Sequence, residues 1–354
     1  MIALAAFEGD ITQLFVAETA TFRDVIAVID RAELQIALVV SPERQLLGTI
    51  TDGDVRRGLL RGLSLDALAR ELMTRDPITV APDLSFHDDG WLLQKRLARR
   101  IPIVSNKTVI GLALPEDEIT PQKVVNPVVI MAGGLGSRLG ALTQDAPKPL
   151  LKVGTKPILE TILEGFLAQG FEQFHISVNY KAQMIEDYFG DGSRWGVDIH
   201  YIRENERLGT AGALSLLEPP NVPIFVMNGD LLTKVNFRQM LEFHRTHRQQ
   251  ASVAVRKYEV RVPFGVVELT RNTITRIVEK PEYPYFVNAG IYLLNPECLP
   301  LIPYNQPFDM PDLLTAILAQ DWRVGSFPIH EYWLDVGRID DFETANLTYA
   351  EVFG

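Results

Sequence analysis

The chain has 354 residues, of which 47% are hydrophobic and 22% are charged, and its formal net charge is −11. This length favours two domains, and the composition is that of a chain that folds nearly throughout. The negative charge argues against a broad basic surface that binds nucleic acid. The single cysteine, Cys298, excludes an intramolecular disulfide and a thiolate-cluster metal site.

The N-terminal sequence MIALAAFEGD lacks the basic flank and the longer apolar run of a signal peptide. No later stretch reaches the length that spans a membrane. A chain with one cysteine also fits a reducing compartment. We therefore expect a cytoplasmic protein with no membrane partner.

An internal repeat occupies the first third of the chain. QIALVVSPERQLLGTITDGDV, near residues 35–55, is echoed by RRIPIVSNKTVIGLALPEDEI, near residues 99–119. Each copy predicts an amphipathic helix (22–30 or 86–98), then a strand, a polar turn, a second strand and an acidic segment that can start a helix. We expect the two copies to pack face to face.

The segment PEDEITPQKVVNP, with three prolines and many charges, marks a domain boundary. We divide the chain into residues 1–122 and 123–354. Beyond the boundary, strands alternate with helices, which predicts an α/β fold with a mostly parallel sheet covered on both faces. Strand-like runs dominate from about residue 251, so antiparallel strands are expected before a closing helix near 340–352. The alternating elements are expected at 127–132, 157–168, 173–179, 183–189, 197–202, 210–217, 223–227 and 237–248.

The strand expected at 127–132 runs into a glycine-rich segment, GGLGSR at residues 133–138. Glycines let the backbone bring its N–H groups against a triphosphate, and Arg138 and Lys148 supply fixed positive charge. The spacing differs from GxGxxG because Leu139 stands where the last glycine belongs, and no Gly-Lys-Ser/Thr follows as in a P-loop. The alternative is a plain strand-to-helix connection with Arg138 as a solvated charge.

This segment resembles the signature of the sugar-1-phosphate nucleotidyltransferases, GGxGTRLxPLTxxxPKPxLxVxxKPxL. The matching residues are GGLGSRL, then Thr143, then PKPLLKVGTKPIL. The resemblance extends over residues 124–354 and implies a Rossmann-like, GT-A-type sheet flanked by helices. Ser137 replaces the usual threonine but keeps a hydroxyl, and Gly140-Ala141 replace the commoner Arg-Pro. The resemblance implies Arg138 and Lys148 as catalytic residues. It implies nucleotide binding by Ala132, Gly133, Gly134, Gly136 and Ser137.

Small residues recur in LGTAGA at 208–213, which is expected to open a helix and to let a flat ligand approach the backbone. In the resembling family this segment packs on the nucleotide base, which implies Gly209, Thr210 and Ala211 as further nucleotide-binding residues. The alternative is a helix start capped by Thr210, which leaves the paired glycines unexplained.

Two aspartates are candidate metal ligands. Asp230 ends the apolar strand PIFVMNGD, at the edge where open α/β sheets bind ligands, and Asp335 lies in the apolar sequence YWLDVG. A carboxylate in such surroundings needs a partner, and a hard divalent cation provides one. The resemblance assigns both to Mg²⁺, with Asp230 also catalytic. Each could instead be a turn or cap residue.

The resemblance implies a further set of residues that meets the sugar phosphate. In this set Lys280 contacts the phosphate and counts as catalytic, and the others line the sugar. The set consists of Phe264, Gly265, Glu279, Lys280, Asn288, Ala289 and Gly290. No histidine stands in a metal-ligand spacing, and His244 and His247 are expected to be solvated on a polar helix face.

These residues imply in-line attack of a sugar-phosphate oxygen on the α-phosphorus of a nucleoside triphosphate, with pyrophosphate leaving. The nucleophile is already ionised, so positioning and charge neutralisation suffice. A nucleotide-sugar-dependent glycosyltransferase is an alternative, but it commonly shows Asp-x-Asp where this chain has Asn228-Gly229-Asp230. A ligand-sensing regulator with a decayed catalytic domain is another.

Residues 1–122 resemble a tandem CBS pair, since Gly48 to Val55 match the element G-x-[ILV]-[ST]-x-x-D-[ILV]. The resemblance implies that a hydroxyl and an acid bind an adenine or guanine nucleotide near a helix N-terminus, which favours anions. The alternative is a capping box, which needs no ligand. The second copy has Leu114 in place of the hydroxyl residue, so one complete site is expected. The implied ligand residues are Thr51, Asp54, Arg56 and Asp117.

A CBS pair before such a catalytic domain resembles a subgroup in which guanylyltransferases supplying GDP-linked amino sugars occur. It implies GTP and a hexose- or hexosamine-1-phosphate, for precursors of cell-surface glycans of the nonulosonate or lipopolysaccharide type. UTP, CTP and dTTP remain alternatives, because base recognition depends on individual hydrogen bonds that the motifs do not reveal. We also expect a homo-oligomer.

Overall fold

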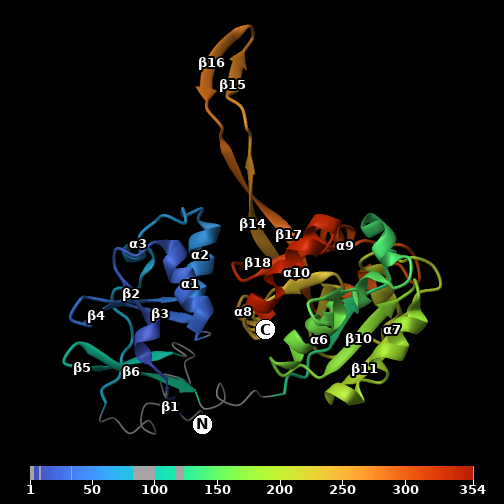
Figure 1. Ribbon diagram of the computed structural model, residues 1–354, viewed down its shortest axis with the longest axis horizontal. Helices are drawn as coiled ribbons and strands as arrows, with labels where there is room; N and C mark the ends of the chain where they lie inside the picture. Colours follow the sequence, from blue (N-terminus) through green and yellow to red (C-terminus); the bar gives the residue numbers. More distant parts are fainter. Residues whose placement is uncertain (1–3, 8, 33, 83–99, 116–122, 354) are drawn as a thin grey trace. The chain divides into compact units, whose positions relative to one another are not determined.

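The computed structural model describes residues 4–7, 9–32, 34–82, 100–115 and 123–353. The chain separates into two compact units, residues 1–122 and 123–354 (Figure 1). The helix expected over 86–98 and the candidate ligand Asp117 lie outside the described residues. In the described part of the chain, no helix has both the length and the apolar character needed to cross a membrane.

The first unit contains two three-stranded sheets, in the orders β2-β3-β4 and β1-β6-β5. The antiparallel pairs β3–β4 and β5–β6 are the two copies of the sequence repeat. Helices α1 and α2 flank the first pair in sequence, as the pattern predicted. The elements are β1 (Leu4–Ala6), η1 (Ile11–Leu14), β2 (Phe15–Ala17), α1 (Phe22–Ala32), β3 (Ile36–Val40), β4 (Leu46–Thr51), α2 (Asp52–Leu60), α3 (Ala69–Leu72), β5 (Ile101–Ser105) and β6 (Thr108–Pro115).

The two copies of the repeat pack against each other through one apolar cluster. Ile36 and Leu38 of β3 meet Val109 and Leu112 of β6 in this cluster, and all four side chains are buried. Their turns are also joined, since the Leu46 N–H donates to the Lys107 carbonyl at 2.9 Å. The expected face-to-face packing is therefore confirmed for the described strands.

The second unit is built on a seven-stranded sheet in the order β11-β10-β7-β12-β17-β14-β18 (Figure 1). Strands β11, β10, β7 and β12 run parallel, and so do β14 and β18, while β17 is antiparallel to both of its neighbours. The sheet is thus mostly parallel, as predicted. Its strands are β7 (Val128–Met131), β10 (Gln173–Val178), β11 (Asp198–Arg203), β12 (Ile224–Asn228), β14 (Ala251–Arg261), β17 (Glu282–Leu294) and β18 (Val324–Ile329).

Alternate residues of the central strands enter two different cores. Val128 and Ile130 of β7 join a cluster with Phe166, whereas Val129 joins a cluster with Leu313 on the opposite face. This period of two shows that both faces of the sheet are covered. The helices are α6 (Ile158–Leu167), α7 (Ala182–Phe189), α8 (Phe237–Thr246), α9 (Met310–Leu318) and α10 (Ile339–Phe353), with 3₁₀ turns η2 (Ser137–Thr143), η3 (Lys148–Leu150), η4 (Ser193–Trp195), η5 (Gly212–Leu216) and η6 (Pro296–Leu301).

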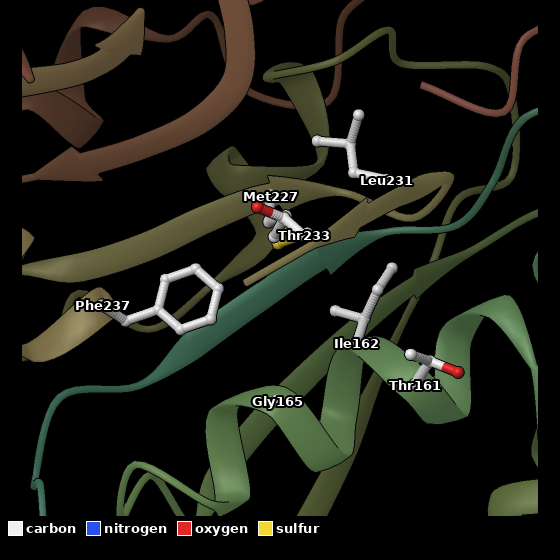
Figure 2. A pocket seen from close by; sticks show the side chains of 7 residues that line it. All are labelled: Thr161, Ile162, Gly165, Met227, Leu231, Thr233 and Phe237. Atoms are coloured by element: carbon white, nitrogen blue, oxygen red, sulfur yellow. The ribbon is translucent and has the colours of Figure 1, made fainter. Parts of the chain in front are cut away.

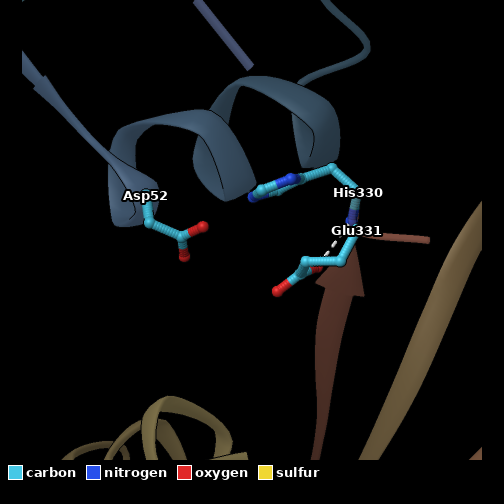
Figure 3. Close-up of side chains that lie close together, drawn as sticks. All are labelled: Asp52, His330 and Glu331. Carbon is cyan, nitrogen blue, oxygen red and sulfur yellow. Dashed lines mark hydrogen bonds between the residues drawn. The ribbon is translucent and has the colours of Figure 1, made fainter. Parts of the chain in front are cut away.

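A two-stranded arm extends from the sheet (Figure 1). Beyond their shared part in the sheet, β14 and β17 stay paired as far as Arg261 opposite Glu282, and a separate hairpin, β15 (Val266–Thr270) and β16 (Thr273–Val278), follows. At its base, the Arg256 guanidinium donates to the Glu331 carbonyl at 2.7 Å. The backbone N–H of His330 donates to the Glu331 carboxylate at 2.9 Å (Figure 3). We call residues 256–287 the arm.

Short pairs complete the second unit and bring distant segments together. Strand β13 (Leu231–Thr233) pairs antiparallel with β19 (Trp333–Asp335), and β8 (Lys152–Val153) pairs with β9 (Lys156–Pro157). The helix expected over 210–217 is only the 3₁₀ turn η5. Gly212 lowers the helix propensity of this segment, and the N–H groups of Ala211 and Gly212 donate to the Phe308 carbonyl, which accounts for the difference.

The expected solvation of His244 is wrong, whereas His247 is exposed as expected. His244 is 2% exposed, and its ring lies 2.9 Å from both the Ser252 hydroxyl and the Asn295 side-chain oxygen. The Asn295 amide nitrogen already donates to the Gln249 carbonyl. The Asn295 oxygen therefore accepts from Nε2–H of His244, and Nδ1 accepts from Ser252. A helix-face pattern cannot reveal this, because the partners lie on β14 and after β17.

We expect the free energy of unfolding to fall as the pH decreases below about 6.5, in part because of His244. Burial lowers the pKa of His244. The unfolded chain therefore takes up a proton first, and the stabilisation present above the unfolded pKa is lost as the pH falls towards the folded pKa. Urea unfolding between pH 7.5 and 5 should give a shallower pH dependence for His244→Gln than for the wild type. Equal slopes for His244→Gln and the wild type would contradict this assignment.

Candidate functional site

The glycine-rich loop after β7 is held closed by a threonine. Gly136 has a left-handed backbone with φ of 65°, and the Thr143 hydroxyl donates at 3.2 Å to the carbonyls of Gly136 and Gly140. A Cβ at Gly136 would lie 2.8 Å from Thr143 Cγ2 and 2.9 Å from Lys148 Cβ. Gly134, by contrast, has open space around it. The loop is therefore shaped from within and presents the exposed Gly134 and Ser137 to solvent.

The buried start of the loop rests on a carboxylate that sequence reasoning missed. Ala132 is 1% exposed, and a Cβ at Gly133 would lie 2.8 Å from Glu204 Oε1. Glu204 accepts from the Ser177 hydroxyl and, at 2.9 Å, from the Leu208 N–H. It thereby joins the loop to the segment at 208–213. The only signal in the sequence was the position of Glu204 directly after β11.

Lys148 and Asp230 form an ion pair at the end of the sheet. Lys148 Nζ lies 2.5 Å from Asp230 Oδ2, and the two side chains are 9% and 24% exposed. Lys148 begins η3, and Asp230 follows β12, whose neighbour β7 leads into the loop. Because β7 and β12 are parallel, their carboxyl ends meet at one edge. The structure thus brings these two predicted residues into direct contact.

Asp335 stands next to Asp230 because β19 pairs with β13. Leu231 is opposite Asp335, and the Val336 N–H donates to the Asp230 carbonyl at 3.0 Å. Asp335 Oδ1 is buried and has no hydrogen-bond partner. Burial and the neighbouring Asp230 carboxylate raise the pKa of Asp335, against the opposing effect of Lys148 and Arg138. A buried carboxylate oxygen without a partner beside a second carboxylate is suited to bind a cation.

Arg138 reaches the same corner from the glycine-rich loop. A Cβ at Gly337 would lie 3.4 Å from Asp335 Oδ1, 3.6 Å from Asp341 Oδ2 and 3.7 Å from Arg138 Nη1. The absence of a side chain at Gly337 therefore leaves room where these three charged groups approach. Arg138 itself is exposed. Asp341, which also fixes the turn through the Arg338 N–H at 2.8 Å, was not among the predicted residues.

The segment Asn288-Ala289-Gly290 lies beside this edge. Gly290 has φ of 72°, and a Cβ there would lie 2.7 Å from Asn228 Nδ2. The Trp333 indole donates to the Ala289 carbonyl at 2.8 Å, and the Asn288 side chain accepts from the Gly290 N–H at 2.9 Å. Asn288 is exposed. These three predicted residues thus share one region with Asp230 and Asp335.

The segment Gly209-Thr210-Ala211 is fixed by the start of α9. The N–H and hydroxyl of Thr210 donate to Asp309 Oδ1 at 2.9 and 3.1 Å, and the Met310 N–H donates to the Thr210 hydroxyl at 2.8 Å. Gly209 is exposed, whereas Ala211 is fully buried. Thr210 therefore caps α9 rather than its own turn, and Gly209 is the part of this segment that faces solvent.

Four residues of the predicted sugar-phosphate set lie on the arm. Glu279 and Lys280 follow β16, and Phe264 and Gly265 precede β15. All four are exposed, Phe264 at 73%. A Cβ at Gly265 would lie 2.9 Å from Glu279 Oε2, so these positions are neighbours across the ribbon. The structure brings them together with each other but not with Asp230 and Asp335.

In the first unit, Asp52 begins α2 (Figure 3). Thr51 and Asp54 form a reciprocal cap at the start of this helix. The Thr51 hydroxyl donates to Asp54 Oδ2 at 2.6 Å, and the Asp54 N–H donates back at 3.3 Å. Arg57 pairs with Asp54 at 2.6 Å, and Arg56 pairs with Asp52 at 2.6 Å. Two of the candidate nucleotide ligands, Thr51 and Asp54, are thus joined to each other in a capping box, whereas Arg56 is paired with Asp52.

The cavity in Figure 2 is separate from the corner formed by Asp230, Asp335, Lys148 and Arg138. It is lined by apolar groups and by the side chains of two threonines, without any charged residue. Such a lining is that of a packing gap beneath the sheet edge rather than of a site for an anionic substrate. The lining residues are Thr161, Ile162, Gly165, Met227, Leu231, Thr233 and Phe237.

Comparison with known proteins identifies the family of the second unit. Residues 127–352 match the family model described as nucleotidyl transferase. The mannose-1-phosphate guanyltransferase of Saccharomyces cerevisiae is 33% identical over 231 residues, which are 62% of this chain and 64% of that protein. The chain thus spans less than two thirds of the length of this relative.

Two solved structures share the fold. A Bacillus anthracis protein named as a glucose-1-phosphate thymidylyltransferase, in complex with sucrose, has a TM-score of 0.53 and 26% identity, covering 66% of this chain and 97% of that chain. HddC from Yersinia pseudotuberculosis, complexed with GMP-PN, has a TM-score of 0.50 and 26% identity, covering 64% of this chain and 100% of that chain.

We expect Gly136→Ala to lower the free energy of unfolding by about 1–2 kcal/mol or more, because an alanine strains the left-handed backbone and meets Thr143 and Lys148. Gly134→Ala is the matched control, since it adds the same methyl group two residues away in open space. Urea unfolding of both variants measures the difference. Equal stabilities would show that the loop is not held in the conformation described here.

Proposed function

This chain belongs to the nucleotidyl transferase family over residues 127–352, and on that basis we propose that it transfers a nucleotidyl group from a nucleoside triphosphate to a sugar-1-phosphate. The reaction releases pyrophosphate and depends on Mg²⁺. The observation that carries this proposal is the corner where Lys148, Asp230 and Asp335 meet Arg138. It offers two carboxylates to a cation and two basic side chains to phosphates.

The magnesium fits the residues present. Asp230 and Asp335 would hold it, and the unpartnered oxygen of Asp335 supports this assignment. When bound, the ion supplies Lewis-acid stabilisation of charge on the phosphate oxygens. Both ligands are hard oxygen donors, which suits Mg²⁺.

The side chains of the chain perform the remaining work by positioning and charge neutralisation. In this proposal the loop at 133–138 would offer backbone N–H groups and Arg138 to the triphosphate. Lys148 is held by Asp230, so its ammonium group has a fixed position from which it would neutralise charge on the phosphates. The attacking sugar-phosphate oxygen is ionised at neutral pH and needs no general base.

We propose GTP as the nucleotide and a hexose- or hexosamine-1-phosphate as the acceptor, for precursors of cell-surface glycans of the nonulosonate or lipopolysaccharide type. The yeast relative, a mannose-1-phosphate guanyltransferase, and HddC, whose structure is complexed with GMP-PN, support a guanine nucleotide. The Bacillus anthracis protein, named for thymidylyl transfer, keeps dTTP as an alternative. UTP and CTP remain further alternatives.

The proposal predicts pyrophosphate release in a matrix of GTP, ATP, UTP, CTP and dTTP against mannose-, glucose- and glucosamine-1-phosphate. We expect GTP to give the highest kcat/KM, and chelation of Mg²⁺ to abolish turnover. A glycosyltransferase would instead consume a nucleotide sugar without pyrophosphate. Absence of turnover with every pair would contradict the proposal and favour a regulator with an inactive catalytic domain.

Asp335→Asn is the sharper control variant for this assay. It removes a buried charge beside Asp230, so we expect at least a 100-fold loss of activity with unchanged or higher stability. Asp230→Asn is less suitable, because it removes the carboxylate that pairs with the Lys148 ammonium group. The Lys148 side chain is only 9% exposed, so this loss should lower the free energy of unfolding by about 3–5 kcal/mol. Full activity of Asp335→Asn would remove Asp335 from the metal site.

We further propose that the first unit is a CBS pair that binds a regulatory adenine or guanine nucleotide at one site, around Thr51 and Asp54. The internal repeat, with its two packed strand pairs, supports this proposal. The capping box has to share Asp54 with the ligand, and each aspartate in the first turn of α2 is already paired with an arginine. Affinity is therefore expected to be modest.

Hydrogen exchange of the full chain with and without AMP or GMP tests this second proposal. We expect slower amide exchange near residues 48–57 when the nucleotide binds, because the first turn of α2 would be ordered further. Exchange on residues 127–150 serves as the internal control for binding at the catalytic corner. No change near 48–57 at millimolar nucleotide would leave the capping box as a purely structural feature.

A further inference from the structure

The arm exposes large apolar side chains in both its inner part and its outer hairpin. In its inner part, Tyr258 pairs with Tyr285 and Val260 with Tyr283, and all four are at least 41% exposed. In the outer hairpin, the pairs are Val267 with Ile277 and Leu269 with Ile274, which are at least 46% exposed. Cross-strand partners point to the same face, so each part of the arm has an apolar side.

The opposite side of the arm is charged. Lys257 pairs with Glu259 at 2.9 Å, and Arg261 lies 3.8 Å from Glu282 across the ribbon. In the outer hairpin Arg276 lies 3.3 Å from Glu268. Phe286 also lies on this side, opposite Lys257, and is 44% exposed. The ribbon is therefore amphipathic, with most of its large exposed apolar side chains opposite the ion pairs.

An uncovered ribbon of this kind is unfavourable. A two-stranded hairpin alone is marginally stable in water. Eight half-exposed apolar side chains offer about 800 Å², taking roughly 100 Å² for each, which is the area that one partner contributes to a standard protein interface. The apolar face is thus large enough to support a specific association.

The arm also carries Glu279 and Lys280 away from the carboxylates of their own chain. Strand β17 is unbroken from Glu282 to Leu294, so Glu282 lies about 20 Å along it from Asn288 at the usual rise per residue. The ladder continues past Glu282, because the Val262 N–H donates to the Pro281 carbonyl at 3.0 Å. A lysine side chain cannot span this distance back to Asp230.

We propose that the arm is exchanged between two copies of this chain. Its apolar face packs on the second copy, where Lys280 and Glu279 complete the sugar-phosphate part of that copy's site. This inference rests on the proposed function for the role of Lys280. A two-fold arrangement repeats the same contact twice and so covers both arms. The first unit of the same chain could also cover the face, but it would bring no catalytic corner to Lys280.

Mixing two inactive variants tests the exchange. Asp335→Asn lacks a metal ligand but has an intact arm, and Lys280→Ala has an intact corner but a defective arm. In a mixed dimer with exchanged arms, the corner of the Lys280→Ala chain receives a complete arm. Equal mixing should therefore restore about a quarter of wild-type activity, because half of the dimers are mixed and one site in each is complete.

The outcomes separate the two proposals. Wild-type turnover with no recovery in the mixture would overturn arm exchange and leave the proposed function standing. Full activity of Lys280→Ala alone would also overturn it, because Lys280 would then complete no site. If the wild type itself shows no turnover, the proposed function fails. The association of two chains through the arm is then tested by sedimentation equilibrium.

Sedimentation equilibrium of the full chain tests the interface without any activity. We expect a dimer whose dissociation constant rises tenfold or more in Ile277→Ser, which loses an exposed apolar side chain that the interface would bury. Arg276→Ser is the matched control on the charged face of the same strand and should leave dimerisation unchanged. A monomeric wild type, or equal dissociation constants for Ile277→Ser and the wild type, would overturn the inference. Circular dichroism confirms that both variants are folded.

Discussion

The ion pair between Lys148 and Asp230 is the contact on which the candidate site depends. Lys148 is almost buried, and a buried ammonium group is tolerated only beside an opposite charge. The pair therefore fixes the end of the glycine-rich loop to the end of β12. Once Asp230 is fixed there, the pairing of β13 with β19 places Asp335 next to it. One electrostatic requirement thus joins three segments that are far apart in the sequence.

Much of this arrangement follows from patterns that are local in the sequence. Alternating apolar and helical segments predicted the parallel strands, since a strand buried on both faces is continuously apolar. The position of Asp230 at the end of such a strand predicted a ligand-binding edge. The repeat in the first unit predicted two strand pairs that pack together. In each case neighbouring residues contain the information.

Other features depend on partners that are distant in the sequence. His244 lies on a polar helix face, yet Ser252 and Asn295 bury it. The alternative interpretation of Thr210 was a cap on its own helix, but Thr210 caps α9, from whose first N–H it accepts. Strand-like runs after residue 251 predicted antiparallel strands, but not that two of them continue as one extended ribbon. Strand length and register are set by pairing across the sheet, which sequence patterns leave open.

The two parts of the candidate site differ in how firmly the fold holds them. The corner with Lys148, Asp230 and Asp335 is built on the sheet, and it carries an internal cost because two carboxylates are placed side by side. Glu279 and Lys280 stand on a ribbon whose own pairing is marginal. If the arm closes on a second copy, the nucleotide part of the site is complete in each chain, whereas the sugar-phosphate part forms only on association. Binding of the second substrate would then be coupled to the oligomeric state, because the same surface supports both.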